Sequence, residues 1–173
     1  APLPRQAFLL VAVEGFNEDQ VCEILDKPKA EVESLLEEAS RQISNQVATD
    51  ILIIEDEPLI AMDIEEMVES LGHKVTGIAR THAEAVRLFE ETSPKMVLAD
   101  IQLADGSSGI DAVNDILKTA EIPVIFITAF PERLLTGDRP EPAFLVTKPF
   151  NPEMVKALIS QALFFERVDA QAA

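Results

Sequence analysis

Tryptophan and tyrosine are absent from this sequence, and Cys22 is its only cysteine. A single cysteine cannot form a disulfide within the chain, which favours a reducing compartment. The apolar runs are short, and none approaches the roughly 18 residues that a membrane-spanning helix needs. We therefore expect a cytoplasmic protein with no part in the membrane.

Basic residues are also scarce. The chain has 14 Lys and Arg against 31 Asp and Glu, which gives a formal net charge of −17. Nucleic acids and anionic membranes are bound by positive surfaces that neutralise phosphates, so the charge argues against both partners. A hydrophobic content of 47% over 173 residues is still enough for a packed core, and it predicts one or two globular domains.

From about residue 50 onward, short apolar runs rich in β-branched residues alternate with helical patterns. Such runs are typical of strands that are buried on both faces. Strict alternation with helices predicts a parallel sheet covered on both faces, with right-handed crossovers. The sequence therefore predicts an α/β fold with a doubly wound, five-stranded parallel sheet. The expected strands cover residues 51–54, 74–79, 95–100, 122–128 and 143–147.

Helical patterns fill the intervals between these strands and end near residues 71, 92, 118 and 166. Residues 131–142 contain one glycine and three prolines, so we expect only a short helix there, at about 132–136. We expect residues 168–173 to be a frayed, disordered tail.

Polar residues lie at the ends of four of the expected strands: Glu55-Asp56, Asp100, Thr128 and Lys148. Because the carboxyl ends of parallel strands share one edge of the sheet, we expect these side chains to converge. Three crowded carboxylates repel one another, and a hard divalent cation such as Mg2+ relieves that repulsion. One carboxylate could then attack a phosphoryl donor to give an aspartyl phosphate, while lysine and threonine bind the phosphoryl oxygens.

Residues from about 50 to 166 resemble the receiver domain of response regulators, which has a flavodoxin- or CheY-like fold. The matching residues are Glu55-Asp56, Asp100, Thr128 with Ala129 after it, and the turn Lys148-Pro149-Phe150. Receivers usually carry a switch aromatic three residues before the lysine. That position here is Leu145, with Phe144 one residue earlier, so we do not expect an aromatic switch of ordinary geometry.

The receiver resemblance implies a role for each residue of the constellation. Asp100 would be the phosphoacceptor, and Thr128 and Lys148 would contact the phosphate. Glu55, Asp56 and Asp100 would bind Mg2+, together with the backbone carbonyl of Gln102. A sensor histidine kinase or a phosphotransfer protein would be the phosphoryl donor.

The first 48 residues carry only helical patterns, so we expect a small all-α domain at 1–48, a short polar link near 45–49 and a receiver domain at 49–167. Gly15 ends a first helix, and Asn17 with Gln20 is typical of a capping box. A third helix follows Pro28 and has apolar residues at helical spacing.

This segment resembles the promoter-recognition region of extracytoplasmic-function sigma factors, which contains a helix-turn-helix. The matching residues are Leu3-Pro4-Arg5-Gln6-Ala7-Phe8-Leu9-Leu10, Val13-Glu14-Gly15-Phe16, Val21-Cys22-Glu23-Ile24-Leu25 and Val32-Glu33-Ser34-Leu35. Residues 1–48 nevertheless hold 4 basic and 9 acidic residues, a balance of 4 − 9 = −5. The basic stripe expected of a DNA-binding surface is missing.

Sigma-like helices followed by a receiver are similar to the PhyR family of alphaproteobacterial general stress response regulators. That resemblance implies an anti-anti-sigma factor that works by partner switching. Phosphorylation of the receiver would free the sigma-like domain to sequester an anti-sigma factor. We therefore expect a binding protein rather than an enzyme, with no direct DNA binding. The family normally has a further sigma-like segment upstream, so we expect this chain to be an N-terminally truncated fragment.

Other functions stay open at this point. A DNA-binding helix-turn-helix response regulator would show salt-dependent DNA binding. A phosphohydrolase with an aspartate nucleophile would turn over phosphate esters, although such enzymes carry Asp-x-Asp after the first strand and this chain has Glu55-Asp56-Glu57. A flavodoxin-like carrier is disfavoured because no tryptophan or tyrosine is present to stack on a flavin.

Overall fold

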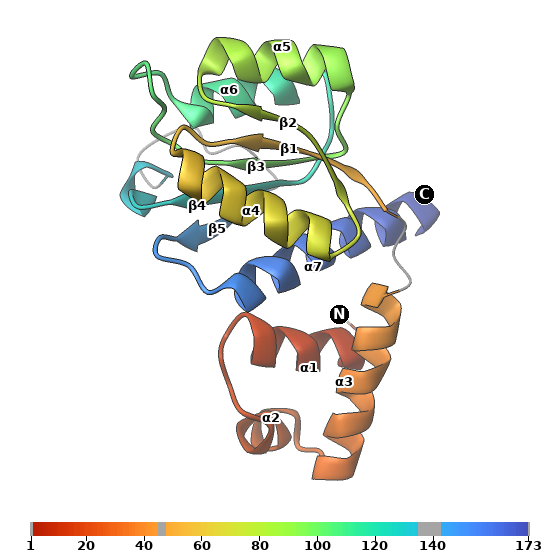
Figure 1. Cartoon of the computed structure of the whole chain (residues 1–173). Coiled ribbons are helices and arrows are strands. Elements are labelled where there is room, and N and C mark those ends of the chain that lie inside the picture. The colour runs from red at the N-terminus through yellow and green to blue at the C-terminus, as the bar shows by residue number, and fades with distance from the viewer. Residues whose placement is uncertain (1, 45–47, 135–142, 173) are drawn as a thin grey trace. The chain divides into compact units, whose positions relative to one another are not determined.

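A computed structural model describes residues 2–44, 48–134 and 143–172 of the chain (Figure 1). Two compact units can be distinguished. One comprises residues 1–47 together with 157–173, and the other comprises residues 48–156. The second unit holds the parallel sheet and the predicted site. The sequence predicted that the receiver ends at residue 167, whereas the second unit ends at residue 156.

Three helices form the N-terminal part of the first unit: α1 (Leu3–Ala12), α2 (Glu18–Leu25) and α3 (Lys29–Ser44). The predicted capping box at the start of α2 is present. The Asn17 side chain accepts a hydrogen bond from the Gln20 backbone N–H, and the Gln20 side chain accepts one from the Asn17 N–H, each at 2.9 Å. Ala7, Val21 and Val32, one from each helix, are fully buried and form a small shared core.

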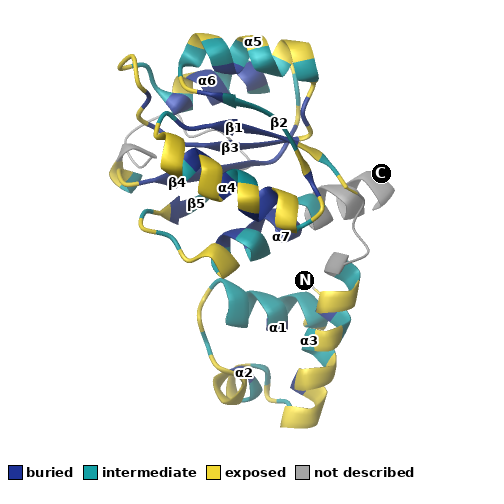
Figure 2. Cartoon of the chain, viewed as in Figure 1, coloured by how far each residue is buried: buried dark blue, intermediate teal, exposed yellow. Residues whose placement is uncertain are grey.

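The second unit contains a parallel sheet of five strands in the order β2-β1-β3-β4-β5, which confirms the predicted fold class. The strands are β1 (Asp50–Ile54), β2 (Lys74–Ala79), β3 (Met96–Ala99), β4 (Val124–Thr128) and β5 (Ala143–Thr147). Every residue of β3 and β4 is buried, as is β1 after Asp50 (Figure 2). This burial explains why these runs are apolar throughout instead of alternating with polar residues.

Helices cover both faces of the sheet (Figure 1). Helices α5 (His82–Thr92) and α6 (Gly109–Leu117) pack together on one face, and α4 (Pro58–Ser70) lies on the other. Thr81 caps α5 by accepting a hydrogen bond from the Glu84 N–H at 3.2 Å. The Glu84 carboxylate accepts from the Arg80 N–H at 2.7 Å instead of from the Thr81 N–H, so only half of a capping box forms at this helix start.

Two expectations about the C-terminal region were wrong. Helix α7 (Pro152–Ala172) does not end near residue 166, and residues 168–172 are helical rather than a frayed tail. These residues include no glycine or proline that would end a helix, and two of the last three are alanine, the strongest helix former. A 3-10 helix, η1 (Pro131–Leu134), replaces the short helix expected at 132–136. The rest of that expected helix lies outside the described residues. Residues 45–47 of the expected link also lie outside them.

Candidate functional site

The three predicted carboxylates meet at the carboxyl ends of β1 and β3. Glu55, Asp56 and Asp100 each offer one oxygen, and these oxygens all lie within 4.8 Å of one another. Strands β1 and β3 are neighbours, with Ile54 opposite Ala99. The Asp100 N–H donates to the Ile54 carbonyl at 2.8 Å, so backbone hydrogen bonding continues beyond the strand and fixes Asp100 beside Glu55. Across the described residues, this is the one cluster of at least three potential metal ligands.

Lys148 reaches the same carboxylates from the end of β5. Its Nζ lies 3.0 Å from Glu55 Oε2 and 3.0 Å from Asp100 Oδ2. The Lys148 N–H donates to the Thr128 carbonyl at 2.8 Å, which ties this residue to the end of β4, and the Lys148-Pro149 peptide is cis. All three side chains are nearly buried: Lys148 is 11% exposed, Glu55 1% and Asp100 8%. A buried lysine between two carboxylates is therefore the centre of the site.

The electrostatics of the cluster follow from burial. Burial raises the pKa of Glu55 to about 7; the Lys148 hydrogen bond opposes this shift and the nearby Asp100 charge adds to it. Burial would lower the pKa of Lys148, but hydrogen bonds to Asp100 and Glu55 outweigh it, so this pKa is raised. The ammonium group of Lys148 contacts two of the three carboxylates, Glu55 and Asp100, and the negative charge left over is the kind that a hard divalent cation stabilises.

The Asp100 carboxylate is held by both of its oxygens. Oδ1 accepts a hydrogen bond from the Ile101 backbone N–H at 2.7 Å, and Oδ2 accepts one from Lys148. Two fixed donors leave the carboxylate little freedom to rotate. Sequence reasoning missed the Ile101 N–H, because a backbone donor leaves no signal in the residue type.

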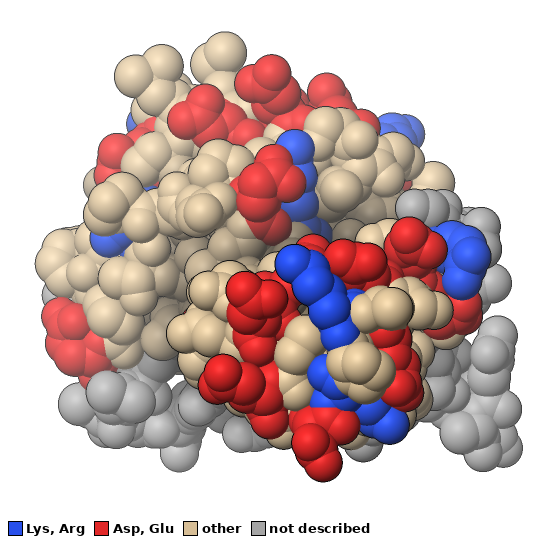
Figure 3. All heavy atoms as spheres, turned by 90° about the horizontal axis from the view of Figure 1, so that it is seen from below, with Lys and Arg blue, Asp and Glu red and all other residues tan. Residues whose placement is uncertain are grey.

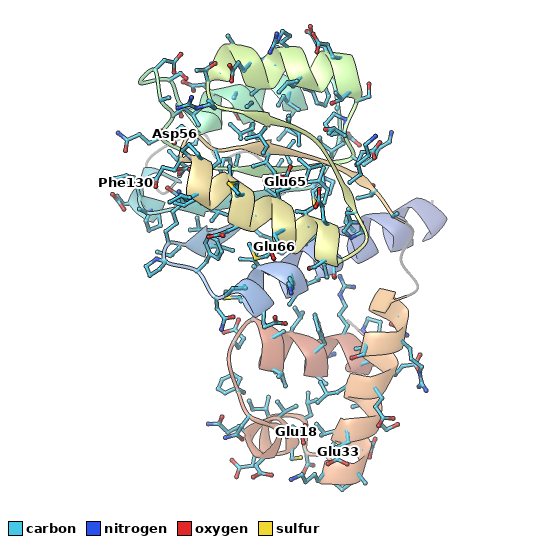
Figure 4. All side chains as sticks on the ribbon, in the orientation of Figure 1. Glu18, Glu33, Asp56, Glu65, Glu66 and Phe130 are labelled. Carbon is cyan, nitrogen blue, oxygen red and sulfur yellow. The ribbon has the colours of Figure 1, made fainter. Side chains whose placement is uncertain are left out.

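Thr128 is fully buried at the end of β4, as predicted for this edge of the sheet. Its Oγ1 accepts a hydrogen bond from the Phe130 N–H at 3.0 Å. Figure 4 shows Phe130 at the same end of the sheet as Asp56, and its side chain is 39% exposed. Sequence reasoning did not single out Phe130, which directly follows the Ala129 of the receiver motif.

Gln102 and Leu145 also have defined places in the structure. Gln102 lies in the loop after β3 and forms an isolated antiparallel bridge with Ser108. Its role as a carbonyl ligand stays a prediction. Leu145 is half-buried and packs against the main core of the sheet, which includes Phe126. A leucine in that environment is part of the core.

A groove of about 810 Å³ opens beside the site, between α4 and the start of α7. It is lined by Ile60, Asp63, Glu66, Met67, Ser70, Ala129, Lys148, Pro149, Phe150, Pro152 and Lys156. Two large apolar side chains of α4 are exposed in the same region of the sequence: Leu59 is 77% exposed and Met62 62%. Lys148 thus contributes both to the carboxylate cluster and to the groove.

Two family models match the chain. The response regulator receiver domain matches residues 51–160, and the sigma-like domain of response regulator PhyR matches residues 1–46. The fold, the carboxylate cluster and the receiver match define a response regulator. No helix in the described parts of the chain has the length and apolar character needed to cross a membrane.

Individual relatives narrow the assignment further. The chain is 64% identical over 167 residues to the phyllosphere-induced regulator PhyR of Methylorubrum extorquens, and this match covers 96% of the chain and 62% of the relative. A crystal structure of the response regulator PhyR from Brucella abortus is 74% identical, with a TM-score of 0.89, and is matched over 99% of this chain and 71% of that one. The chain belongs to the PhyR family of response regulators.

One further relative has a bound partner. The anti-anti-sigma factor PhyR from Bartonella quintana, in a co-crystal with the anti-sigma factor NepR, is 68% identical with a TM-score of 0.51, and the match covers 94% of this chain and 66% of that one. The present chain spans 62% of the length of the Methylorubrum relative, so these proteins contain residues beyond those matched here.

Proposed function

We propose that this chain is a phosphorylation-controlled anti-anti-sigma factor. In this proposal the receiver accepts a phosphoryl group on Asp100, and phosphorylation raises the affinity of the sigma-like helices for an anti-sigma factor. The observation that carries the first half is Lys148 Nζ at 3.0 Å from both Glu55 and Asp100. The second half is supported by the family match and by the NepR complex of the Bartonella relative.

The proposed chemistry is a phosphoryl transfer without turnover of a substrate. An oxygen of the Asp100 carboxylate forms a bond to phosphorus while the bond from phosphorus to the leaving group breaks, and the leaving group keeps that electron pair. An acyl phosphate would release a carboxylate, and a phosphohistidine would release an imidazole. The Lys148 ammonium, already 3.0 Å from Asp100 Oδ2, would donate a hydrogen bond to a phosphoryl oxygen, and the Thr128 hydroxyl would bind a second one.

Glu55, Asp56 and Asp100 would hold Mg2+, with the Gln102 carbonyl as a further ligand. One oxygen of each lies within 4.8 Å of the others, and the pKa of Glu55 is raised first by burial and also by the nearby Asp100 charge, a repulsion that a cation would relieve. When bound, Mg2+ would supply positive charge to the transferring phosphoryl group. Until then Lys148 supplies the only positive charge in contact with the two buried carboxylates among the described residues.

The phosphoryl donor would be a sensor histidine kinase or a phosphotransfer protein. The groove between α4 and the start of α7 opens next to Lys148, and the exposed Leu59 and Met62 offer apolar contacts on α4. A donor that rests on this surface would bring a phosphohistidine to the edge of the sheet where Asp100 lies.

The surface of the sigma-like helices favours a protein partner over DNA. Lys27, Lys29 and Arg41 each pair with a carboxylate, at 3.1 Å to Glu31, 3.8 Å to Asp19 and 2.6 Å to Glu38. Acidic residues outnumber basic ones by 9 to 4 over residues 1–48, and Figure 3 shows acidic side chains around the few basic ones on this unit. A surface of this kind repels phosphates and would suit a partner with basic residues.

Acyl-phosphate labelling tests the acceptor. The wild-type protein, incubated with radiolabelled acetyl phosphate and Mg2+, should acquire one acid-stable, base-labile label, and Asp100→Asn should acquire none. Asp111→Asn is the matched control, because Asp111 is an exposed aspartate on α6 outside the site. Labelling of Asp100→Asn at the wild-type level would contradict the assignment of the acceptor.

Binding measurements test the output. Affinity for a helical anti-sigma protein should increase when Mg2+ and beryllofluoride are added, while promoter DNA shows no binding in either state. Anti-sigma binding that does not change on activation would remove the phosphorylation control. Salt-dependent DNA binding would favour a helix-turn-helix transcription factor instead.

A further inference from the structure

Gly109, the first residue of α6, lies against the backbone of Asp100. A Cβ atom at position 109 would lie 1.7 Å from the Asp100 carbonyl oxygen, 2.9 Å from its carbonyl carbon and 3.4 Å from the Ile101 Cα. Real Cβ contacts of this kind are not observed, and the atoms that would have to move are backbone atoms. Position 109 therefore requires glycine, because any side chain there would clash with the peptide that joins Asp100 and Ile101.

That peptide also orients the Asp100 side chain. The carbonyl group of Asp100 and the N–H of Ile101 belong to one planar unit, so they move together. The carbonyl oxygen faces Gly109, and the N–H donates to Asp100 Oδ1 at 2.7 Å. Displacing the carbonyl would tilt the plane and carry the N–H away from the carboxylate. Gly109 thus contacts the one peptide whose N–H fixes Oδ1.

The loop that connects these residues is closed by several backbone contacts. The Gly109 N–H donates to the Ile101 carbonyl at 2.7 Å, and Gln102 is bridged to Ser108. The Leu103 N–H donates to the Ser107 carbonyl at 3.1 Å. Because both ends of the loop are tied together, a side chain at position 109 cannot be accommodated by moving α6 alone.

We propose that Gly109 is a positioning residue for the phosphoacceptor: the absence of a side chain at position 109 lets the 100–101 peptide take the orientation that aligns the Asp100 carboxylate. This inference rests on the proposed function of Asp100. Gly109 does not touch a phosphoryl group or a metal ligand side chain, and it acts through the backbone of residues 100 and 101.

The test is Gly109→Ala, with two readouts. Apparent Mg2+ affinity and the initial rate of labelling by acetyl phosphate should each fall by about 10- to 100-fold, the usual effect of losing a group that orients a ligand. The amide proton of Ile101 should also lose the downfield NMR shift that a hydrogen bond to a carboxylate gives. That second readout reports the orientation of the 100–101 peptide without any need for activity.

Gly106→Ala is the control from the same loop. Gly106 has φ +81° and no atom within 4 Å of its hypothetical Cβ, so alanine there strains the turn without contacting Asp100. It should lower the melting temperature, because a side chain at positive φ is strained, and change the labelling rate less than threefold. An equal loss of labelling in both variants would mean that loop integrity alone matters and would overturn the proposal.

If Gly109→Ala does not fold, the same NMR measurement on the wild-type protein tests the role of Gly109. The Ile101 amide of the wild-type protein should be shifted downfield and protected from hydrogen exchange. An Ile101 amide that exchanges as fast as an exposed loop amide would overturn the proposal. Labelling that persists in Asp100→Asn contradicts the proposed acceptor instead, and the NMR readout then decides the role of Gly109 separately.

Discussion

The Lys148 ammonium group balances two buried carboxylates, Glu55 and Asp100. Replacing it with an apolar residue of similar length, Lys148→Met, would leave both without a cationic partner. Removing one partner of a buried ion pair costs about 3–5 kcal/mol. We expect the free energy of unfolding, measured in urea without metal, to fall by a similar amount. Adding Mg2+ should raise the free energy of unfolding more in the variant than in the wild type.

Lys118→Met is the matched control for that comparison. Lys118 pairs with Asp115 at 2.9 Å, but its side chain is 73% exposed, so its removal should cost at most about 1 kcal/mol. Equal losses in the two variants would show that the Lys148 contacts contribute no more than a surface ion pair.

Burial of Glu55 should make the free energy of unfolding depend on pH. The pKa of this carboxyl is raised from 4.5 to about 7, so the folded protein binds a proton more tightly than the unfolded chain does. The resulting stabilisation is fully present below pH 4.5 and is lost as the pH rises through 7. Without metal, we expect Glu55 to contribute about 1 kcal/mol less to the free energy of unfolding at pH 8 than at pH 6.

Comparison with Glu55→Gln isolates this effect. The buried His73, whose pKa is lowered by burial, changes stability in the opposite direction over the same range, because protonation at low pH disfavours the fold. The difference between wild type and variant cancels that contribution. A difference in unfolding free energy that stays constant from pH 6 to 8 would contradict the raised pKa. Protons and Mg2+ would also compete for Glu55, so Mg2+ affinity should increase over this range in the wild type.

At the scale of elements, the loop after β4 is coupled to Thr128. Its hydroxyl oxygen accepts the Phe130 N–H at 3.0 Å, and Leu145 on β5 is held in the core where receivers usually carry a switch aromatic. If Thr128 turns toward a bound phosphoryl group, the Phe130 N–H loses its acceptor. We expect the Phe130 amide NMR signal to shift when beryllofluoride and Mg2+ are added.

Thr128→Ala should remove that shift and lower stability by about 1 kcal/mol through the lost hydrogen bond. Thr119→Ala is the control, since the Thr119 hydroxyl donates to the Ile116 carbonyl at the end of α6 and lies outside the site. A Phe130 signal that moves equally in wild type and Thr128→Ala would show that another group carries the change into the loop.

The same elements explain which parts of the fold were predictable. All residues of β3 and β4 are buried, as are those of β1 after Asp50, so these runs are apolar up to the polar residues predicted for the site at their ends. Convergence of Glu55, Asp56, Asp100 and Lys148 then follows from the parallel topology alone. The end of α7 was missed because residues 167–172 have no breaker and no apolar period. The contact between Gly109 and Asp100 was missed because it involves backbone atoms.

For the whole molecule, the charge distribution separates a protein-binding function from a DNA-binding one. Residues 1–48 carry a balance of −5, and Glu18 on α2 and Glu33 on α3 are exposed carboxylates of that unit (Figure 4). If a basic anti-sigma surface recognises them, the double variant Glu18→Lys with Glu33→Lys, which changes the balance to −1, should weaken binding and flatten its salt dependence.

We expect that loss to be about tenfold or more at low salt, measured by isothermal titration calorimetry of the beryllofluoride-activated protein. Glu90→Lys with Glu91→Lys makes the same change in net charge on α5 of the receiver, where both residues are exposed, and should leave the affinity within about threefold. Equal losses in the two double variants would mean that net charge, rather than the sigma-like surface, governs the association. Acetyl phosphate labelling of Asp100 should be unchanged in both double variants, because neither pair of residues touches the carboxylate cluster. The phosphorylation chemistry at Asp100 would then be independent of the Glu18 and Glu33 surface that binds the partner.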